Sequence, residues 1–493
     1  MSKSKAIIIG SGIGGMAVAI RLAVKGFDVE VFEKNSYPGG KLSAFEKDGF
    51  HFDAGPSLFT QPQNIEELFS LADEKIDNYF SYEPVNISCK YFYENGKIIS
   101  AFKSIVDFEK ELMLQLNERP GSLKKYLSDS QKLYKNIGSI FLNYSLHKRK
   151  TWFSKRIVNA LATIKYPYLF QSLHQYNSKK FKSAEAIQLF DRYATYNGSD
   201  PYQAPGMLSL IPHLEQNEGV FYPKGGMISI TNAVYKLALA KGVKFHFNSL
   251  VEKITTKDNY IMGVKTEERE VNADVVISNG DIYFTYKNLL NKEDESKKIL
   301  KQERSSSAVI FYWGIKKQFD QLGLHNIFFS NNYQEEFKNI FTTKEITTDP
   351  TIYINITSKM EKTLAPVAKE NWFVMVNAPA NTGQDWSQLK QQLRMSVISK
   401  LTRLLKEDIA TLIEIEHVLD PIGIEQQTSS YMGSLYGSSS NSKLAAFCRH
   451  PNFSSSVNGL YFCGGSVHPG GGIPLCLKSA KIVSELITDD LRK

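Results

Sequence analysis

The fold of this chain is decided by Lys5-Ala6-Ile7-Ile8-Ile9-Gly10-Ser11-Gly12-Ile13-Gly14-Gly15, followed by Asp28-Val29-Glu30-Val31-Phe32-Glu33. An apolar run that glycine stops this early is too short for a helix and predicts a buried parallel strand. The glycines have the G-x-G-x-x-G spacing, which allows a tight turn, close approach to a pyrophosphate, and close packing of helix on strand. A second strand ends at Glu33, where an acid suits a ribose hydroxyl. The unit predicts a Rossmann-like α/β domain that binds a dinucleotide.

Glu33, at the end of the second predicted strand, indicates which dinucleotides are favoured. An acid at position 33 disfavours a 2′-phosphate, so FAD or NAD is favoured over NADP. The phosphates are expected at the N-terminus of the first helix, where backbone N–H groups point outward. The alternative is an ordinary βαβ unit with a glycine-rich turn.

Length and composition define the class of protein. A chain of 493 residues is long enough for two or three domains, and 59 basic against 51 acidic residues give a modest net charge of +8. The four cysteines, Cys89, Cys448, Cys463 and Cys476, are widely spaced and are expected to be reduced, which predicts a cytosolic protein. The apolar run after the first lysines belongs to the nucleotide motif, so it is not interpreted as a signal peptide. No apolar run is long enough to span a bilayer, which leaves only peripheral membrane contact.

Two further glycine turns give the sequence its specific resemblance. Glu33-x(5)-Gly39-Gly40-Lys41 and Asp53-Ala54-Gly55-Pro56-Ser57 keep the backbone small, which suits an extended cofactor nearby. These elements resemble those of FAD-dependent amine-oxidase-like flavoproteins, above all the bacterial phytoene-desaturase type of carotenoid desaturase. The resemblance extends to Arg192–Tyr202 and Phe221–Met227, and it is closest to the branch that desaturates hydroxycarotenoids at the 3,4 position.

The C-terminal region carries the second half of this resemblance. A buried strand leads into Cys463-Gly464-Gly465-Ser466-Val467-His468-Pro469-Gly470-Gly471-Gly472-Ile473-Pro474, and a helix follows. The resemblance implies that this strand completes the FAD site and that the helix dipole lies beside the isoalloxazine. It also implies that Val251 lies beside the adenine and that the strand ending at Asn279 returns to the cofactor domain. The predicted cofactor-binding residues are Gly10, Gly12, Ile13, Gly14, Gly15, Glu33, Lys34, Gly40, Lys41, Gly55, Pro56, Ser57, Leu58, Val251, Asn279, Gly464, Gly465, Gly472 and Ile473.

The domain organisation follows from these motifs. Residues 1–75, 225–300 and 420–493 are predicted to form a discontinuous FAD-binding domain. Residues 76–130, 185–224 and 301–419 are predicted to form a mixed-sheet substrate domain, closed by a lid helix near residues 388–405. Residues 131–184 are predicted to be a helical segment that faces a membrane.

That last prediction rests on residues 145–184, which contain many Lys and Arg residues and no acidic one, interleaved with aromatic residues. Such a segment could lie on an anionic bilayer, where a lipid-soluble substrate would enter. The alternative is a solvated basic helical hairpin whose aromatic residues, such as Tyr168 and Phe181, pack inward. No other feature supports nucleic-acid binding.

The predicted function is FAD-dependent desaturation of an acyclic or 1-hydroxylated carotenoid by hydride transfer to the flavin, in a long apolar tunnel. Phytoene desaturation, a flavin amine oxidase and a non-enzymatic GDP dissociation inhibitor are the alternatives. No second dinucleotide motif is present, so a quinone or oxygen is the expected electron acceptor. No metal-binding pattern is found and no catalytic base is assigned; Asp53, His468 and, on a supposed strand edge, His325 are interpreted as structural. Cys463 lies on the strand side of the C-terminal turn, so the flavin is expected to be noncovalent.

Overall fold

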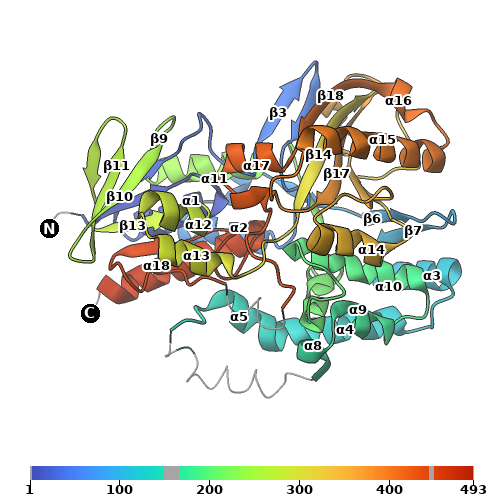
Figure 1. Ribbon diagram of the computed structural model, residues 1–493, viewed down its shortest axis with the longest axis horizontal. Helices are drawn as coiled ribbons and strands as arrows, with labels where there is room; N and C mark the ends of the chain where they lie inside the picture. The colour runs from blue at the N-terminus through green and yellow to red at the C-terminus, as the bar shows by residue number, and fades with distance from the viewer. Residues whose placement is uncertain (1–2, 149–150, 152–165, 443–448, 492–493) are drawn as a thin grey trace.

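The structure is a computed structural model, which describes residues 3–148, 151, 166–442 and 449–491. Figure 1 shows a parallel sheet with its helices on the left, a large sheet at the upper right, and a group of helices below that sheet. The chain passes between these regions several times, so segments far apart in sequence build the same layer.

The nucleotide motif forms the centre of a five-stranded parallel sheet. The strand order is β19-β13-β1-β2-β9, so the chain leaves β1 on one side to β2 and reaches β13 on the other. In open α/β sheets a ligand binds at such a switch point, beyond the carboxyl ends of the strands. The strands are β1 (Lys5–Ile9), β2 (Asp28–Phe32), β9 (Lys244–His246), β13 (Val275–Ser278) and β19 (Leu460–Phe462).

Both faces of this sheet are covered. Ala6, Ile8 and Val31 pack under four helices: α1 (Ile13–Val24), α2 (Gln63–Leu71), α11 (Ile228–Ala240) and α18 (Ile473–Leu491). Ile7 and Val276 face the opposite way, against a three-stranded antiparallel sheet of β10 (Val251–Lys257), β11 (Tyr260–Thr266) and β12 (Glu270–Asn272). Because both faces are buried, these strands are continuously apolar rather than alternating.

The second half of the molecule is built on a seven-stranded mixed sheet. Its order is β18-β14-β17-β16-β15-β6-β7, and the β15–β6 pair is its parallel one. The strands are β6 (Ile87–Phe92), β7 (Ile98–Phe102), β14 (Ser307–Ile315), β15 (His325–Phe328), β16 (Ile352–Asn355), β17 (Glu370–Ala378) and β18 (Ile413–Leu419). One face, with Trp313, Trp372 and Val374, packs against α15 (Trp386–Leu405).

The other face of the large sheet lies above the lower group of helices in Figure 1. Tyr91 and Ile327 from the sheet share one core with Tyr126 and Phe190 from these helices. The helices are α3 (Ile105–Leu116), α4 (Ser122–Leu133), α5 (Ser139–Asn143), α8 (Tyr166–Phe170), α9 (Leu173–Ser178) and α10 (Ala184–Asp191). The other α-helices and β-strands of the described residues are β3 (Ala44–Lys47), β4 (Phe50–Asp53), β5 (Tyr82–Pro84), β8 (Phe221–Pro223), α12 (Ile282–Phe284), α13 (Glu293–Leu300), α14 (Tyr333–Lys338), α16 (Ile409–Leu412) and α17 (Pro421–Thr428).

The predicted fold class, a Rossmann-like unit joined to a mixed-sheet unit, is confirmed. The predicted lid helix is wrong in its placement, because α15 buries the sheet face that points away from the cavity described below. The division into three domains stays a prediction. No helix within the described residues is long and apolar enough to cross a membrane.

Candidate active site

One continuous cavity of about 910 Å³ joins the two halves of the molecule. It begins among the glycine turns at the carboxyl end of the parallel sheet and ends under the seven-stranded sheet. All of the predicted cofactor-binding residues line it except Gly15, although they come from widely separated stretches of the sequence. The structure therefore brings the predicted site residues together.

Gly15 lies behind the cavity wall and has a packing role. A Cβ atom on Gly15 would lie 2.2 Å from the carbonyl oxygen of Gly10, which no real contact allows. Helix α1 can therefore pack against the turn only if position 15 is glycine, as the motif predicts. Gly12, the residue that caps α1, has no side chain to bond the first backbone N–H groups of the helix, which are directed at the cavity.

Asn279 sits at the centre of the glycine turns. A Cβ atom on Gly12 would lie 2.7 Å from its Nδ2 atom, and Cβ atoms on Gly14 or Gly464 would lie 2.8 Å from its Oδ1 atom. The same Oδ1 accepts a bond from the thiol of Cys463 at 3.4 Å. Asn279 thus fills the space that the missing side chains leave and holds the first and last turns of the fold together.

Glu33 is fixed at the far end of the cavity. Its Oε2 accepts hydrogen bonds from the backbone N and the Oγ of Ser11, each at 2.8 Å, and its Oε1 accepts one from the Asn35 backbone at 2.9 Å. These donors hold the carboxylate at the end of β2 while it still lines the cavity. Val251, the first residue of β10, lines the cavity at the same end.

The two downstream glycine turns pack on the first one. Gly39 donates to the Ser11 carbonyl at 2.9 Å, and a Cβ on Gly40 would meet the Cα of Gly12 at 3.4 Å. A Cβ on Gly55 would lie 1.8 Å from the Lys41 carbonyl oxygen. The loop of residues 55–58 is therefore in close contact with the Lys41 turn, and both line the cavity.

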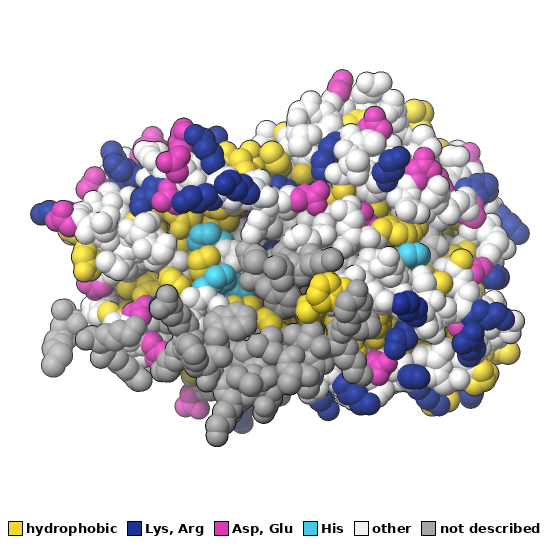
Figure 2. Space-filling model, turned by 60° about the horizontal axis from the view of Figure 1, so that its bottom comes forward, with side chains coloured by type: hydrophobic (Ala, Val, Ile, Leu, Met, Phe, Trp, Pro, Cys, Tyr) yellow, Lys and Arg dark blue, Asp and Glu magenta, His cyan; other side chains and the backbone are white. Residues whose placement is uncertain are grey.

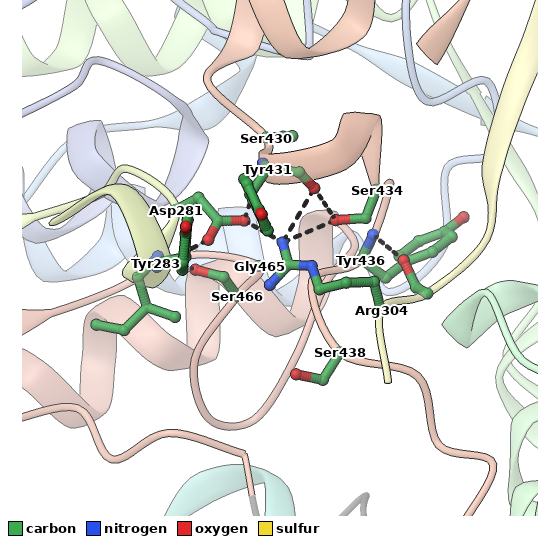
Figure 3. Close-up of polar contacts among 12 residues, drawn as sticks. Asp281, Tyr283, Arg304, Ser430, Tyr431, Ser434, Tyr436, Ser438, Gly465 and Ser466 are labelled. Atoms are coloured by element: carbon green, nitrogen blue, oxygen red, sulfur yellow. Dashed lines mark hydrogen bonds and ion pairs between the residues drawn. The ribbon is translucent and has the colours of Figure 1, made fainter. Parts of the chain in front are cut away.

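Figure 3 shows how the C-terminal turn is tied to the rest of the site. Arg304 forms a buried ion pair with Asp281 and donates to the Oγ of Ser434 at 2.8 Å. Ser466, which follows the Gly464-Gly465 turn, accepts a hydrogen bond from the Ile282 backbone at 3.0 Å. These contacts set the position of the segment that leads into helix α18, whose first residue, Ile473, lines the cavity.

The buried positive charges in the cavity are the observation that shows whether this site fits FAD. Lys41 and Arg449 line the cavity and, in the part of the chain that the structure describes, bond only to backbone carbonyls, those of residues 434, 435, 436, 438 and 465. Burial lowers the pKa of Lys41 to about 8 and that of Arg449 to about 10. The positive charge of Arg304 contributes to both lowered pKa values, and its Nε and Nη1 atoms have no hydrogen-bond partner among the described residues. Cations without a paired carboxylate suit a cofactor with an anionic pyrophosphate, so the site fits FAD.

The rest of the cavity is an apolar chamber. Alternate residues of the seven-stranded sheet, including Ile310, Phe373 and Met375, form one wall. Met207, Leu208 and Ile211, which follow the lower helices, form the opposite wall. On one side the chamber is closed by Ile137, Gly138, Phe141, Leu142 and Leu146. This lining suits a long apolar ligand.

A buried polar cluster stands in the wall of this chamber. Arg192 donates to both oxygens of Glu215, at 2.8 and 3.1 Å, and to the hydroxyl of Tyr91 at 2.9 Å. Glu215 also accepts bonds from Tyr193 and Gln216. Arg192 belongs to a stretch that resembles a family motif, whereas Glu215 is not predicted, because its role depends on a contact across 23 residues that no local pattern reveals.

Asp53, His468 and His325, which the sequence predicts to be structural, occupy different places relative to the cavity. Asp53 accepts bonds from the Met227 and Ile228 backbones at 2.9 and 3.2 Å, so it anchors the start of α11 and does not line the cavity. His468 lines the cavity and lies 3.0 Å from the Tyr144 carbonyl. The expectation that His325 lies on a strand edge is wrong, because β15 is an interior strand and His325 lines the chamber.

Comparison with known proteins identifies the class. The model of the family of flavin-containing amine oxidoreductases matches residues 13–488. The chain therefore belongs to this family, and it is an FAD-dependent oxidoreductase. This result confirms the predicted cofactor and the predicted enzyme class.

Individual relatives with known activities resemble the chain over nearly its full length. The chain is 50% identical, over 98% of its length and 99% of the relative's, to the 1-hydroxycarotenoid 3,4-desaturase of Flavobacterium sp. (strain P99-3). It is 31% identical, over 99% of its length and 97% of the relative's, to the 4,4'-diaponeurosporene oxygenase of Staphylococcus haemolyticus (strain JCSC1435). Among solved structures, an oxidoreductase from Methanosarcina mazei matches 98% of this chain and 100% of its own, with 16% identity and a TM-score of 0.66, which supports the fold alone.

Buried histidines make the stability depend on pH. Burial lowers the pKa of His325, His450 and His468 to about 4 each, from about 6.5 in an unfolded chain. Between these values the unfolded chain binds more protons, so we expect stability to fall as pH drops from about 6.5 to 4, by up to about 3 kcal/mol per histidine. Urea unfolding midpoints at pH 7 and pH 5 test this, and H325Q should remove part of the difference. Equal midpoints would contradict it.

The flavin is expected to be released when the protein is denatured. Cys463 is fully buried, its thiol donates to Asn279, and it does not line the cavity. Cys476 lines the cavity, but burial raises the pKa of its thiol to about 11, so the reactive thiolate is scarce at neutral pH. Denaturation followed by filtration should leave the yellow colour in the filtrate. Colour that stays with the polypeptide would show a covalent bond.

Proposed function

We propose that this flavoprotein is a carotenoid desaturase that introduces a C–C double bond at the 3,4 position of an acyclic, 1-hydroxylated carotenoid. The observation that carries the proposal is the single cavity that joins a cofactor cleft to an apolar chamber. Full-length 50% identity to a 1-hydroxycarotenoid 3,4-desaturase supports the same reaction. When bound, FAD accepts the hydride that leaves the substrate carbon.

The residues of the chain position the two reactants. The N-terminus of α1 and Gly12 and Gly14 receive the pyrophosphate, and Glu33 receives the ribose. Val251 would contact the adenine, and the Gly464-Gly465 turn with the N-terminus of α18 would contact the isoalloxazine. The remaining predicted residues complete the lining of this cleft.

The chamber then fixes the polyene by shape. Its walls of Ile310, Phe373 and Met375 against Met207 and Leu208 exclude water and offer contact along an extended hydrocarbon. We assign no catalytic base. Phytoene remains the second candidate substrate, and the electrons pass on to a quinone or to oxygen.

Access from a membrane is part of the proposal. The chamber wall includes Phe141 and Leu142, just before the basic, aromatic segment of residues 145–184, and Leu146 within it. Phe170, also within that segment, is 50% exposed. Figure 2 shows this face, where hydrophobic side chains reach the surface beside the grey atoms and basic side chains stand toward the right-hand edge. Tyr168 and Phe181 instead pack in the helical core, as the hairpin alternative expects. Arg149, Lys150, Trp152, Phe153, Lys155, Arg156 and Lys165 lie outside the described residues.

Vesicle binding tests the membrane contact. Charge reversal at Arg149, Lys155 and Arg156 should weaken binding to anionic vesicles about a hundredfold, since each basic residue contributes about 1 kcal/mol. Reversal of Lys297, Lys298 and Lys301 in and after α13, all exposed, is the matched control. Equal binding by both variants would contradict a role for the basic segment.

Pigment analysis tests the reaction. Cells that make acyclic hydroxylated carotenoids should, on expression of this protein, accumulate a pigment with a red-shifted spectrum and two hydrogens fewer. Pigments that stay unchanged, although the cells hold soluble FAD-loaded protein, would reject the proposal. A pigment that gains oxygen would instead favour the chemistry of the diaponeurosporene oxygenase relatives.

A further inference from the structure

His325 presents an unpaired hydrogen-bonding atom in the wall of the apolar chamber. It lies on β15, where the cavity face of the sheet also carries Ile327. The side chain is 3% exposed, and its Nε2 atom has no hydrogen-bond partner among the residues that the structure describes. A buried polar atom without a partner is rare and costs free energy, so a partner is expected in the functional state.

The contacts of the ring settle which nitrogen carries the proton. Asn355 Nδ2 lies 3.1 Å from the Leu324 carbonyl oxygen, which can only accept, and the same Nδ2 lies 3.2 Å from His325 Nδ1. His325 Nδ1 must therefore accept. Burial lowers the pKa of the ring to about 4, so the ring is neutral at pH 7. The proton of the neutral ring is thus on Nε2, which is a donor.

A chain of hydrogen bonds ties this donor to the cofactor side of the cavity. The Tyr353 hydroxyl lies 2.7 Å from His325 Nδ1 and 2.7 Å from Ser57 Oγ. Since Nδ1 accepts, Tyr353 donates to it, and Ser57 donates to Tyr353. Ser57 belongs to the loop that contacts the Lys41 turn through Gly55. The ring of His325 is therefore held in one orientation, close to the cofactor cleft.

The buried ion pair in this wall has its hydrogen-bond partners within the protein. Arg192 and Glu215 satisfy each other together with Tyr91, Tyr193, Tyr196 and Gln216. This network lies near His325, on which both charges act electrostatically. An apolar carotene that filled the chamber would leave the Nε2–H group unpaired, whereas a ligand with an oxygen at this point would satisfy it.

We propose that His325 Nε2–H donates a hydrogen bond to the hydroxyl oxygen at the end of the carotenoid, which makes His325 a specificity-determining residue. This inference rests on the proposed function and specifies its substrate. In a 1-hydroxylated substrate desaturated at the 3,4 position, one carbon separates the hydroxyl-bearing carbon from the reacting bond. The anchor for the hydroxyl must therefore lie beside the cofactor, and the link through Tyr353 to Ser57 places His325 there.

Two acyclic carotenoids that differ only in the 1-hydroxyl group provide the test. For the wild-type protein we expect kcat/KM to be at least about tenfold higher for the hydroxylated one, the worth of one buried hydrogen bond. H325F removes the donor and should abolish this preference by slowing the hydroxylated substrate alone. H325Q keeps a donor at similar reach and should retain most of the preference. H450F is the matched control, because His450 is half-buried, has the same low pKa and does not line the cavity.

Binding to the FAD-free protein, followed by quenching of tryptophan fluorescence, gives a readout that needs no turnover. Tighter binding of the hydroxylated carotenoid to the wild-type protein supports the inference even if H325F fails to fold. Equal binding of both carotenoids, or an unchanged preference in folded H325F, would overturn it. Failure of the proposed function is distinct, because the wild-type protein would then desaturate neither carotenoid.

Discussion

Gly15→Ala is expected to yield protein that binds FAD about a hundredfold more weakly, or not at all. The added methyl group would lie 2.2 Å from the Gly10 carbonyl oxygen, which is backbone and cannot turn away. Overpacking typically costs about 1–3 kcal/mol, and a clash with backbone falls at the upper end of that range. Helix α1 must then move from the turn that presents its N-terminus to the cofactor.

The ratio of flavin to protein absorbance after purification, together with titration of FAD into the FAD-free protein, measures this effect. Gly323→Ala is the matched control, because a Cβ there would meet nothing nearer than Lys90 Cδ at 3.8 Å. Normal FAD affinity in Gly15→Ala would contradict the packing role assigned to the third glycine.

Glu215→Gln is expected to destabilise the protein by about 3–5 kcal/mol, the cost of leaving one charge of a buried pair without its partner. Arg192 and Glu215 are 6% and 3% exposed, so water cannot replace the lost carboxylate. The midpoint of urea unfolding, followed by tryptophan fluorescence, measures the loss.

Two comparisons separate this from a general effect of removing charge. Glu293→Gln breaks the exposed Lys297–Glu293 pair on α13 and should cost less than about 0.5 kcal/mol. The double variant R192M/E215Q should lose less than the sum of the two single variants, because it leaves neither charge unpaired. Additive losses would mean that the pair is not coupled.

The cofactor cleft could be predicted from the sequence because its requirements are local. Gly15 is required by a contact within one strand-turn-helix unit, with the Gly10 carbonyl oxygen, and Glu33 follows one helix later. Their spacing therefore carries the information. The role of Asn279 in joining the first and last turns could be named only through the family resemblance, since it depends on a contact between distant segments.

The substrate chamber could not be predicted from local sequence patterns, because it depends on contacts between distant segments. The sequence of β15 predicts a strand but not its neighbours. The parallel pairing of β15 with β6, which lies far earlier in the chain, makes β15 an interior strand. His325 was therefore assigned to an edge. Likewise, α15 has an apolar face in sequence, but nothing local tells which side of the sheet that face covers. Phe181 packs inward against the ring of Tyr126, and Tyr168 packs inward against the ring of Tyr176.

Anaerobic mixing of the purified, FAD-loaded protein with an acyclic 1-hydroxylated carotenoid tests the central claim most directly. The account predicts that the absorbance of oxidised flavin disappears while one carotenoid per flavin loses two hydrogens, as measured by mass. Flavin that stays oxidised with every polyene but is bleached by a primary amine would contradict the account and would assign the protein to the amine oxidases.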